Sequence, residues 1–152
     1  MLFIFIISIL IIVDQVAKFF VLKYIMPIDT YPLIEGFFHL TYAENIGAAF
    51  SILQGKQIFL IITTILFTCF LVFYLFKIKT KKDTLWFKIS LSLIIGGAIG
   101  NLIDRIRLSY VIDFFDFRYI NFAIFNTADS FVVVGTIFLV IIILFGNTDN
   151  IL

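Results

Sequence analysis

The chain contains little charge and almost none of the side chains that usually hold metal ions. Only 14% of its 152 residues are charged, and the formal net charge is +1. One histidine, His39, and one cysteine, Cys69, are too few for a zinc site built on imidazoles or thiolates. A near-neutral balance also gives no indication of a nucleic-acid partner. We therefore expect no metal, no cofactor and no nucleic acid.

Apolar residues are abundant instead, at 62% of the chain, and the mean hydropathy is +1.17. The length suits one domain covering residues 1–152. Its long apolar runs, which contain few charges, predict an all-α membrane protein with four transmembrane helices. We expect the four spans at about residues 2–22, 58–76, 85–103 and 127–146.

The first span could pass for a signal peptide, but it lacks a basic start and a small-residue cleavage site. It also carries Asp14 and Lys18, which lie four residues apart and therefore on one helix face. We expect a retained helix in which the two charges pair. The pair either fixes helix packing or acts at a functional site, and the sequence leaves both readings open.

The distribution of basic residues predicts an orientation. Five of the eleven lysines and arginines lie in residues 77–88, between the second and third spans. Because cytoplasmic loops are enriched in such residues, we expect both termini in the cytoplasm and both longer connections outside.

The first of these connections, residues 23–56, contains helix breakers at Pro27, Pro32 and Gly36. Residues 37–42 then alternate between apolar and polar side chains, which is typical of a half-buried strand. We expect a short hairpin there.

Four aspartates, Asp104, Asp113, Asp116 and Asp129, lie between residue 96 and residue 130, next to two apolar spans. Two carboxyl groups at a semi-dry site can share a proton, so that one acts as an acid and the other as a base. Arginines close to Asp104 and Asp116 favour structural ion pairs for those two. Asp113 has apolar neighbours and Asp129 lies in a predicted first helical turn, where the helix dipole favours an anion. Residue chemistry favours this pair without deciding it.

Several alternatives remain at this stage. Ser130 is a possible nucleophile, with Lys18 arriving from another helix as its base. The aspartates could relay protons through the membrane, or the chain could be a non-enzymatic assembly factor packed through Gly96 and Gly100. The amides of Asn45, Asn101 and Asn126 either orient the aspartates or bind a substrate backbone, or they form hydrogen bonds with helix ends.

Five blocks of sequence carry a family resemblance when they are taken together and in order. They are Asp14–Lys18 (DQVAK), Asn45–Phe50 (NIGAAF), Gly96–Arg105 (GGAIGNLIDR), Val111–Phe114 (VIDF) and Phe125–Ser130 (FNTADS). This set resembles lipoprotein signal peptidase, the type II signal peptidase of bacteria.

The resemblance implies an aspartic endopeptidase of the bacterial cytoplasmic (inner) membrane whose site faces outward. It implies diacylglyceryl-modified prolipoproteins as substrates, cut before the lipidated cysteine, with membrane lipid and globomycin-type inhibitors as further ligands. It also implies a small extracytoplasmic β-cradle and a loop over the site. We further expect a monomer. The implied catalytic residues are Asp113 and Asp129. The implied supporting residues are Asp14, Lys18, Asn45, Gly47, Asn101, Asp104, Arg105, Asn126 and Ala128.

Overall fold

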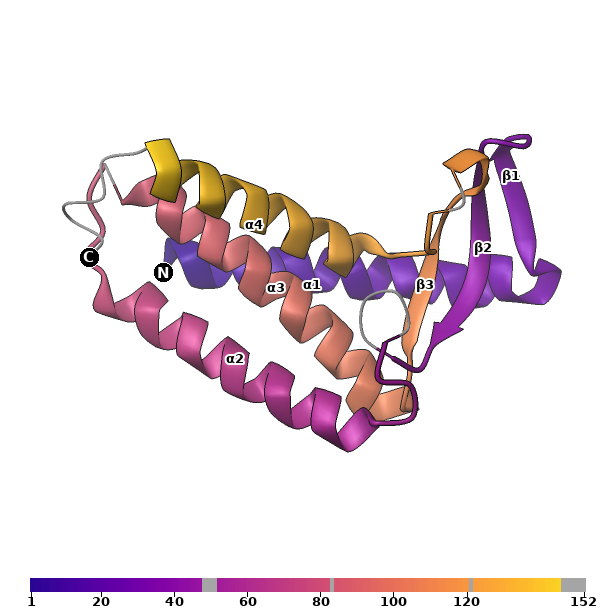
Figure 1. The fold of residues 1–152 in the computed structure, drawn as a ribbon, viewed down its shortest axis with the longest axis horizontal. Coiled ribbons are helices and arrows are strands. Elements are labelled where there is room, and N and C mark those ends of the chain that lie inside the picture. Colours follow the sequence, from indigo (N-terminus) through magenta and orange to yellow (C-terminus); the bar gives the residue numbers. More distant parts are fainter. Residues whose placement is uncertain (48–51, 83, 121, 146–152) are drawn as a thin grey trace.

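Four long helices run side by side, and a small sheet closes one end of the bundle (Figure 1). The computed structural model describes residues 1–47, 52–82, 84–120 and 122–145. The helices are α1 (Leu2–Phe20), α2 (Gln57–Lys77), α3 (Leu85–Leu108) and α4 (Thr127–Phe145). All four are long and apolar enough to cross a membrane, which confirms the predicted fold class. Residues 48–50 of the predicted NIGAAF block, and residue 146 at the predicted end of the fourth span, lie outside the described residues.

Helix α3 is the centre of the bundle. Its most apolar stretch is 56% buried, against 11–22% for the other three helices, and it contacts each of them. At the end away from the sheet, Leu91 and Ile95 of α3 pack with Phe3 of α1 and Leu75 of α2 in the larger apolar core. The other helices therefore bury one face against α3 and leave the rest of their surface apolar and open.

Glycines let α1 and α4 approach α3 closely. A Cβ atom on Gly96 would lie 2.8 Å from Leu10 Cβ of α1, and one on Gly100 would lie 2.6 Å from Asp14 Oδ2. A Cβ on Gly97 would collide with the backbone carbonyl of Ala128 in α4. The predicted close-contact face is confirmed, and it serves two neighbouring helices.

The helix ends differ from the predicted ones. The first helix continues as a π-helical turn (Val21–Ile25) and a 3₁₀ turn (Met26–Ile28). Pro27 lies near the start of the 3₁₀ turn, where the backbone N–H that proline lacks is not needed for a helical hydrogen bond. The predicted end of the third span at residue 103 was wrong, because α3 continues to Leu108. The residue that caps it, Ser109, has a left-handed backbone with φ of 67°. Within this added turn, Asp104 is buried and pairs with Lys18.

The sheet has three antiparallel strands in the order β1 (Thr30–Ile34), β2 (Phe38–Asn45), β3 (Val111–Phe117). The β1–β2 hairpin is the predicted one, and Pro32 is tolerated because β1 is an edge strand. Strand β3 was not predicted, because its near-continuous apolar sequence lacks the alternation of a half-buried strand. It brings the α3–α4 connection to the hairpin and so joins the two halves of the chain.

A register shift between Leu40 and Ala43 of β2 interrupts its pairing with β3. Before the shift Leu40 pairs with Phe115, and after it Ala43 pairs with Asp113. Such bulges twist a strand and change the direction of its side chains. The irregularity therefore lies directly beside the strand residue that carries a predicted catalytic carboxyl group.

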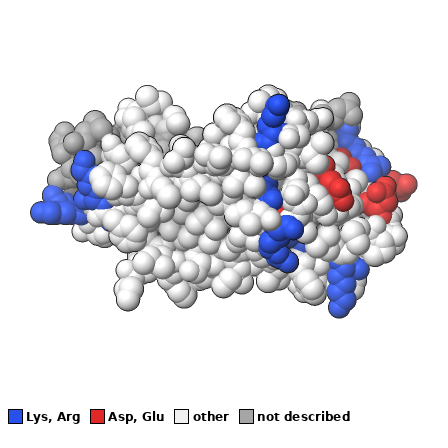
Figure 2. Space-filling model, turned by 90° about the horizontal axis from the view of Figure 1, so that it is seen from below, with Lys and Arg blue, Asp and Glu red and all other residues white. Residues whose placement is uncertain are grey.

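The outer surface fits a multi-pass membrane protein. Large apolar side chains such as Ile62 of α2 and Val133 and Ile137 of α4 are at least half exposed. In the view of Figure 2, charged side chains lie at the left end and over the right-hand part of the molecule, and the broad band between these two regions carries none. This distribution suits side chains that face lipid along the helices and water at the ends.

Because the atom nearest to a Cβ on Gly97 belongs to the backbone of α4, that contact cannot be relieved by rotating a side chain. We expect Gly97→Ala to lower the free energy of unfolding by about 1–3 kcal/mol through overpacking. Ala98→Ser, one residue along at a half-buried position, is the control and should cost less. Denaturant unfolding of the detergent-purified protein, followed by helical circular dichroism, measures both. Equal stability of the two variants would contradict the close contact.

Candidate active site

The structure brings the two predicted catalytic aspartates to either side of Asn126. Asp113 comes from β3 and is 2% exposed, whereas Asp129 lies half-buried in the first turn of α4. The Asn126 side-chain amide donates to Asp113 Oδ1 at 2.6 Å, and its backbone N–H donates to Asp129 Oδ2 at 3.2 Å. One residue thus links the carboxyl group of the sheet to that of the helix.

The start of α4 fixes the side chain of Asp129. Asn126 Oδ1 accepts a hydrogen bond from the backbone N–H of Asp129 at 2.9 Å, while Asp129 accepts the one from Asn126 N–H. This reciprocal pair is a capping box, which satisfies two backbone donors at a helix start. Asn126 therefore caps α4, and it also contacts both aspartates.

The other two asparagines each hold one aspartate. Asn45 Nδ2 donates to Asp113 Oδ2 at 3.0 Å, and Asn45 Oδ1 accepts from Gly47 N–H at 2.9 Å. Asn101 Nδ2 of α3 donates to Asp129 Oδ1 at 2.7 Å. Of the two readings left open by the sequence, contact with aspartates holds for all three asparagines, and Asn126 caps a helix as well.

A buried ion cluster lies behind this arrangement. Lys18 Nζ contacts Asp14 Oδ2 at 2.9 Å, Asp104 Oδ2 at 2.8 Å and Asn101 Oδ1 at 3.0 Å. The three charged residues are at most 2% exposed, so each charge depends on its partners. The predicted Asp14–Lys18 pair is confirmed, and Asp104 pairs with Lys18 instead of the adjacent Arg105.

Asp14 also ties α1 to the start of α4. Its Oδ1 accepts from Thr127 Oγ1 at 2.6 Å and from the backbone N–H of Ala128 at 3.0 Å. Gln15 Nε2 bridges Asp14 and Asp104 at 3.2 and 3.1 Å. Gln15 and Thr127 were absent from the predicted site. Their polarity within or beside apolar spans was the signal that could have identified them.

The remaining predicted residues lie at the rim or apart. Arg105 Nη2 donates to the carbonyl of Gly47 at 3.0 Å and so joins α3 to the end of β2. The predicted ion pair of Asp116 is confirmed with Arg118 Nε at 2.8 Å. Burial acts to raise the Asp116 pKa, but hydrogen bonds from Arg118 and Thr41 outweigh it and hold that pKa below its usual value. Asp116 is thus an ionised structural partner.

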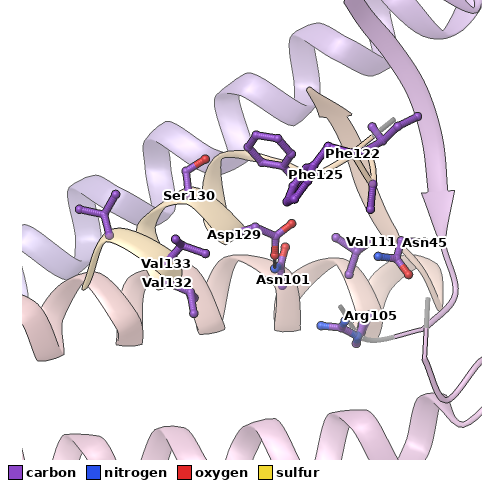
Figure 3. Close-up of a pocket in the computed structure, with 13 residues that line it drawn as sticks. Asn45, Asn101, Arg105, Val111, Phe122, Phe125, Asp129, Ser130, Val132 and Val133 are labelled. Atoms are coloured by element: carbon purple, nitrogen blue, oxygen red, sulfur yellow. Dashed lines mark hydrogen bonds between the residues drawn. The ribbon is translucent and has the colours of Figure 1, made fainter. Parts of the chain in front are cut away.

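A cavity of about 500 Å³ opens beside Asp129, and Figure 3 shows Asp129 and Asn101 projecting together from adjacent helices at its wall. Most of its lining is apolar. The lining residues are Asn45, Asn101, Arg105, Val111, Phe122, Ala123, Ile124, Phe125, Asp129, Ser130, Val132, Val133 and Val134. No cluster of three metal-ligating side chains occurs within the described part of the chain. The site therefore presents carboxyl and amide groups to an apolar ligand volume.

Burial raises the pKa of Asp113 to about 7, and the charge of Asp129 contributes in the same direction. Hydrogen bonds from Asn45 and Asn126 oppose this shift without cancelling it. Asp113 can therefore hold a proton at neutral pH, as an acid catalyst must.

The alternative nucleophile lacks its base. Ser130 lines the cavity, but its hydroxyl donates to the carbonyl of Asn126 at 3.0 Å. Lys18 is engaged by two carboxylates and an amide oxygen. This geometry favours aspartate chemistry over a Ser–Lys pair.

Known proteins resemble this chain over nearly its whole length. The family model for Signal peptidase (SPase) II matches residues 6–145. The chain belongs to the signal peptidase II family. It is 50% identical over 150 residues to the lipoprotein signal peptidase of Clostridioides difficile, covering 99% of both chains. It is 48% identical over 140 residues to that of Caldanaerobacter subterraneus, covering 92% of this chain and 94% of the relative.

Two solved bacterial membrane enzyme structures have the same fold as this signal peptidase II family member. One, at 2.3 Å resolution, has a TM-score of 0.80 and 37% identity, covering 97% of this chain and 90% of its own. The other, at 1.9 Å, has a TM-score of 0.80 and 35% identity, covering 94% and 92%. Family and fold together identify the chain as a membrane peptidase.

Removing the cation of the buried cluster should be costly. Lys18→Met leaves Asp14 and Asp104 without their ionic partner, and breaking a buried pair in this way typically costs about 3–5 kcal/mol. Lys23→Met, an exposed position further along the first helix, is the matched control and should change stability little. Chemical denaturation of both purified variants measures the difference. Equal unfolding midpoints would show that the cluster does not stabilise the fold.

Proposed function

We propose that this protein is an aspartic endopeptidase that removes the signal peptide from diacylglyceryl-modified prolipoproteins, cutting before the lipidated cysteine. The observation that carries this proposal is the linkage of Asp113 and Asp129 through Asn126 beside an apolar cavity. Membership of the family and the names of the relatives support prolipoproteins as the substrate class.

In the proposed reaction, ionised Asp129 takes a proton from water while the water oxygen bonds to the scissile carbonyl carbon. Protonated Asp113 donates to the carbonyl oxygen, which gives a neutral tetrahedral intermediate. Asp129 then returns its proton to the leaving nitrogen as the C–N bond breaks, and Asp113 recovers its own from the hydroxyl group. The raised pKa of Asp113 and the position of Asp129 at a helix N-terminus support this division of roles.

The asparagines act as positioning residues in this proposal. Asn45 and Asn126 donate to opposite oxygens of Asp113, which limits rotation of its carboxyl group. Asn101 holds Asp129 and is itself held by Lys18, so the amide of Asn101 connects the buried ion cluster to the site. A carboxyl pair fixed in this way needs little reorganisation when charge develops.

The surroundings of the site suit a lipid-linked substrate. Valines of α4 line the cavity and continue into the exposed apolar face of that helix, where acyl chains of the substrate would lie. The lysine-rich connection at the opposite end supports an outward-facing site in the cytoplasmic membrane, with both termini in the cytoplasm. We expect a monomer to be sufficient, and globomycin-type peptides to compete for the same cavity.

Cleavage of a diacylglyceryl-prolipoprotein by the purified protein tests the proposal. Asp113→Asn and Asp129→Asn should each lower kcat by at least about 10²–10⁴-fold, because each removes a proton-transfer group. Asp116→Asn, on the same strand as Asp113 but paired with Arg118, is the control and should retain activity within a few-fold. Globomycin binding by each variant reports folding. Full cleavage by either dyad variant would place the chemistry on another residue.

The pH dependence of cleavage tests the assigned roles. Because the pKa of Asp113 is raised to about 7, its acid form is present below that pH and is lost above it. We expect kcat/KM to fall tenfold per pH unit well above pH 7, and to fall again in acid when Asp129 takes up a proton. Initial rates across the pH range, with helical content measured at each value, provide the test. A flat profile through neutral pH would contradict an acidic role for Asp113.

A further inference from the structure

The chain that enters α4 first runs back along β3. The backbone N–H of Phe125 donates to Phe115 O at 3.2 Å, and Phe125 O accepts from Phe115 N–H at 2.7 Å and from Phe114 N–H at 3.0 Å. Both backbone groups of Phe125 are therefore used on the free edge of β3. This short pairing makes the segment before Asn126 an outer strand-like piece of the sheet.

The preceding residue, Ile124, has the opposite orientation. In an antiparallel pair, the backbone groups of successive residues point to opposite edges. The N–H and C=O of Ile124 must then point away from β3, and neither has a hydrogen-bond partner among the residues that the structure describes. Ile124 lines the same cavity as Asn101 and Asp129. An unpaired donor and acceptor on an apolar wall favour a ligand that supplies both partners.

We propose that the backbone of Ile124 binds the substrate main chain, pairing with one residue of an extended segment beside the scissile bond. This inference rests on the proposed function and specifies how that site holds its peptide. The substrate N–H would donate to Ile124 O, and the substrate carbonyl would accept from Ile124 N–H, as in the addition of a strand to a sheet edge. Recognition of this kind reads the peptide backbone and is independent of the substrate side chains.

The position of Ile124 sets the register of the bound peptide. Ile124 lies two residues before Asn126, which contacts both aspartates. At most about 7 Å of extended chain therefore separates Ile124 from Asn126. A substrate strand advances about 3.3 Å per residue. The paired substrate residue should therefore lie within about three residues of the cleaved bond.

Backbone esters in the substrate test this pairing with the unaltered protein. The probe is a synthetic peptide spanning the cleavage site with a diacylglyceryl-modified cysteine, in which one amide at a time becomes an ester and loses its N–H. We expect one position within three residues of the cut to lower kcat/KM by about tenfold, while its immediate neighbours change it less than about threefold. A flat series would overturn the inference and would indicate that water or lipid satisfies Ile124.

A variant tests the donor from the protein side. Ile124→Pro removes the N–H and should lower kcat/KM for the all-amide peptide by about tenfold. In the matched Ile124→Val, which keeps the N–H, the same substrate position should remain the sensitive one. If the proline variant does not fold, the ester series alone decides. Cleavage of the all-amide peptide separates the two proposals, because its absence in the unaltered protein would overturn the proposed function itself.

Discussion

A single buried ammonium group holds the polar half of this membrane protein together. Lys18 of α1 contacts Asp14 on its own helix, and Asp104 and Asn101 on α3. Each partner then contacts another element. Asp14 accepts from a hydroxyl and a backbone N–H at the start of α4, Asp104 accepts from the N–H of Ile112 in β3, and Asn101 donates to Asp129. The hydrophobic effect does not drive helices together inside a lipid bilayer, so hydrogen bonds and ion pairs of this kind fix how the helices align.

The sheet supplies what helices alone do not. A helix can place carboxyl groups only at positions along its own length. Strand β3 instead crosses the end of the bundle and brings Asp113 to the start of α4. The bulge in β2, the amide of Asn45 and the cap residue of α4 all act on this one junction. The separation of the polar site from the lipid-facing surface follows, because the polar groups meet where helices end and strands begin.

The sequence best predicted the features that depend on residues close together along the chain. Apolar runs gave the four helices, and helical spacing gave the Asp14–Lys18 pair and the glycine contacts. Non-local partners could not be derived in this way. Asp104 stands beside Arg105 in sequence but pairs with Lys18, and β3 has no alternating pattern because both of its faces are covered. The family resemblance named the aspartates, whereas Gln15 and Thr127 emerged only from the packing of three helices.

Asn126 has further consequences for how this sequence can change. Its amide oxygen receives Asp129 N–H, its amide nitrogen reaches Asp113 and Asn101, its backbone N–H binds Asp129, and its carbonyl accepts from Ser130. Aspartate would keep the cap but set a third carboxylate against the other two, and serine would cap without reaching β3. Neither substitution preserves both roles. A change at Asn126 would therefore disturb the start of α4 and the carboxyl pair together.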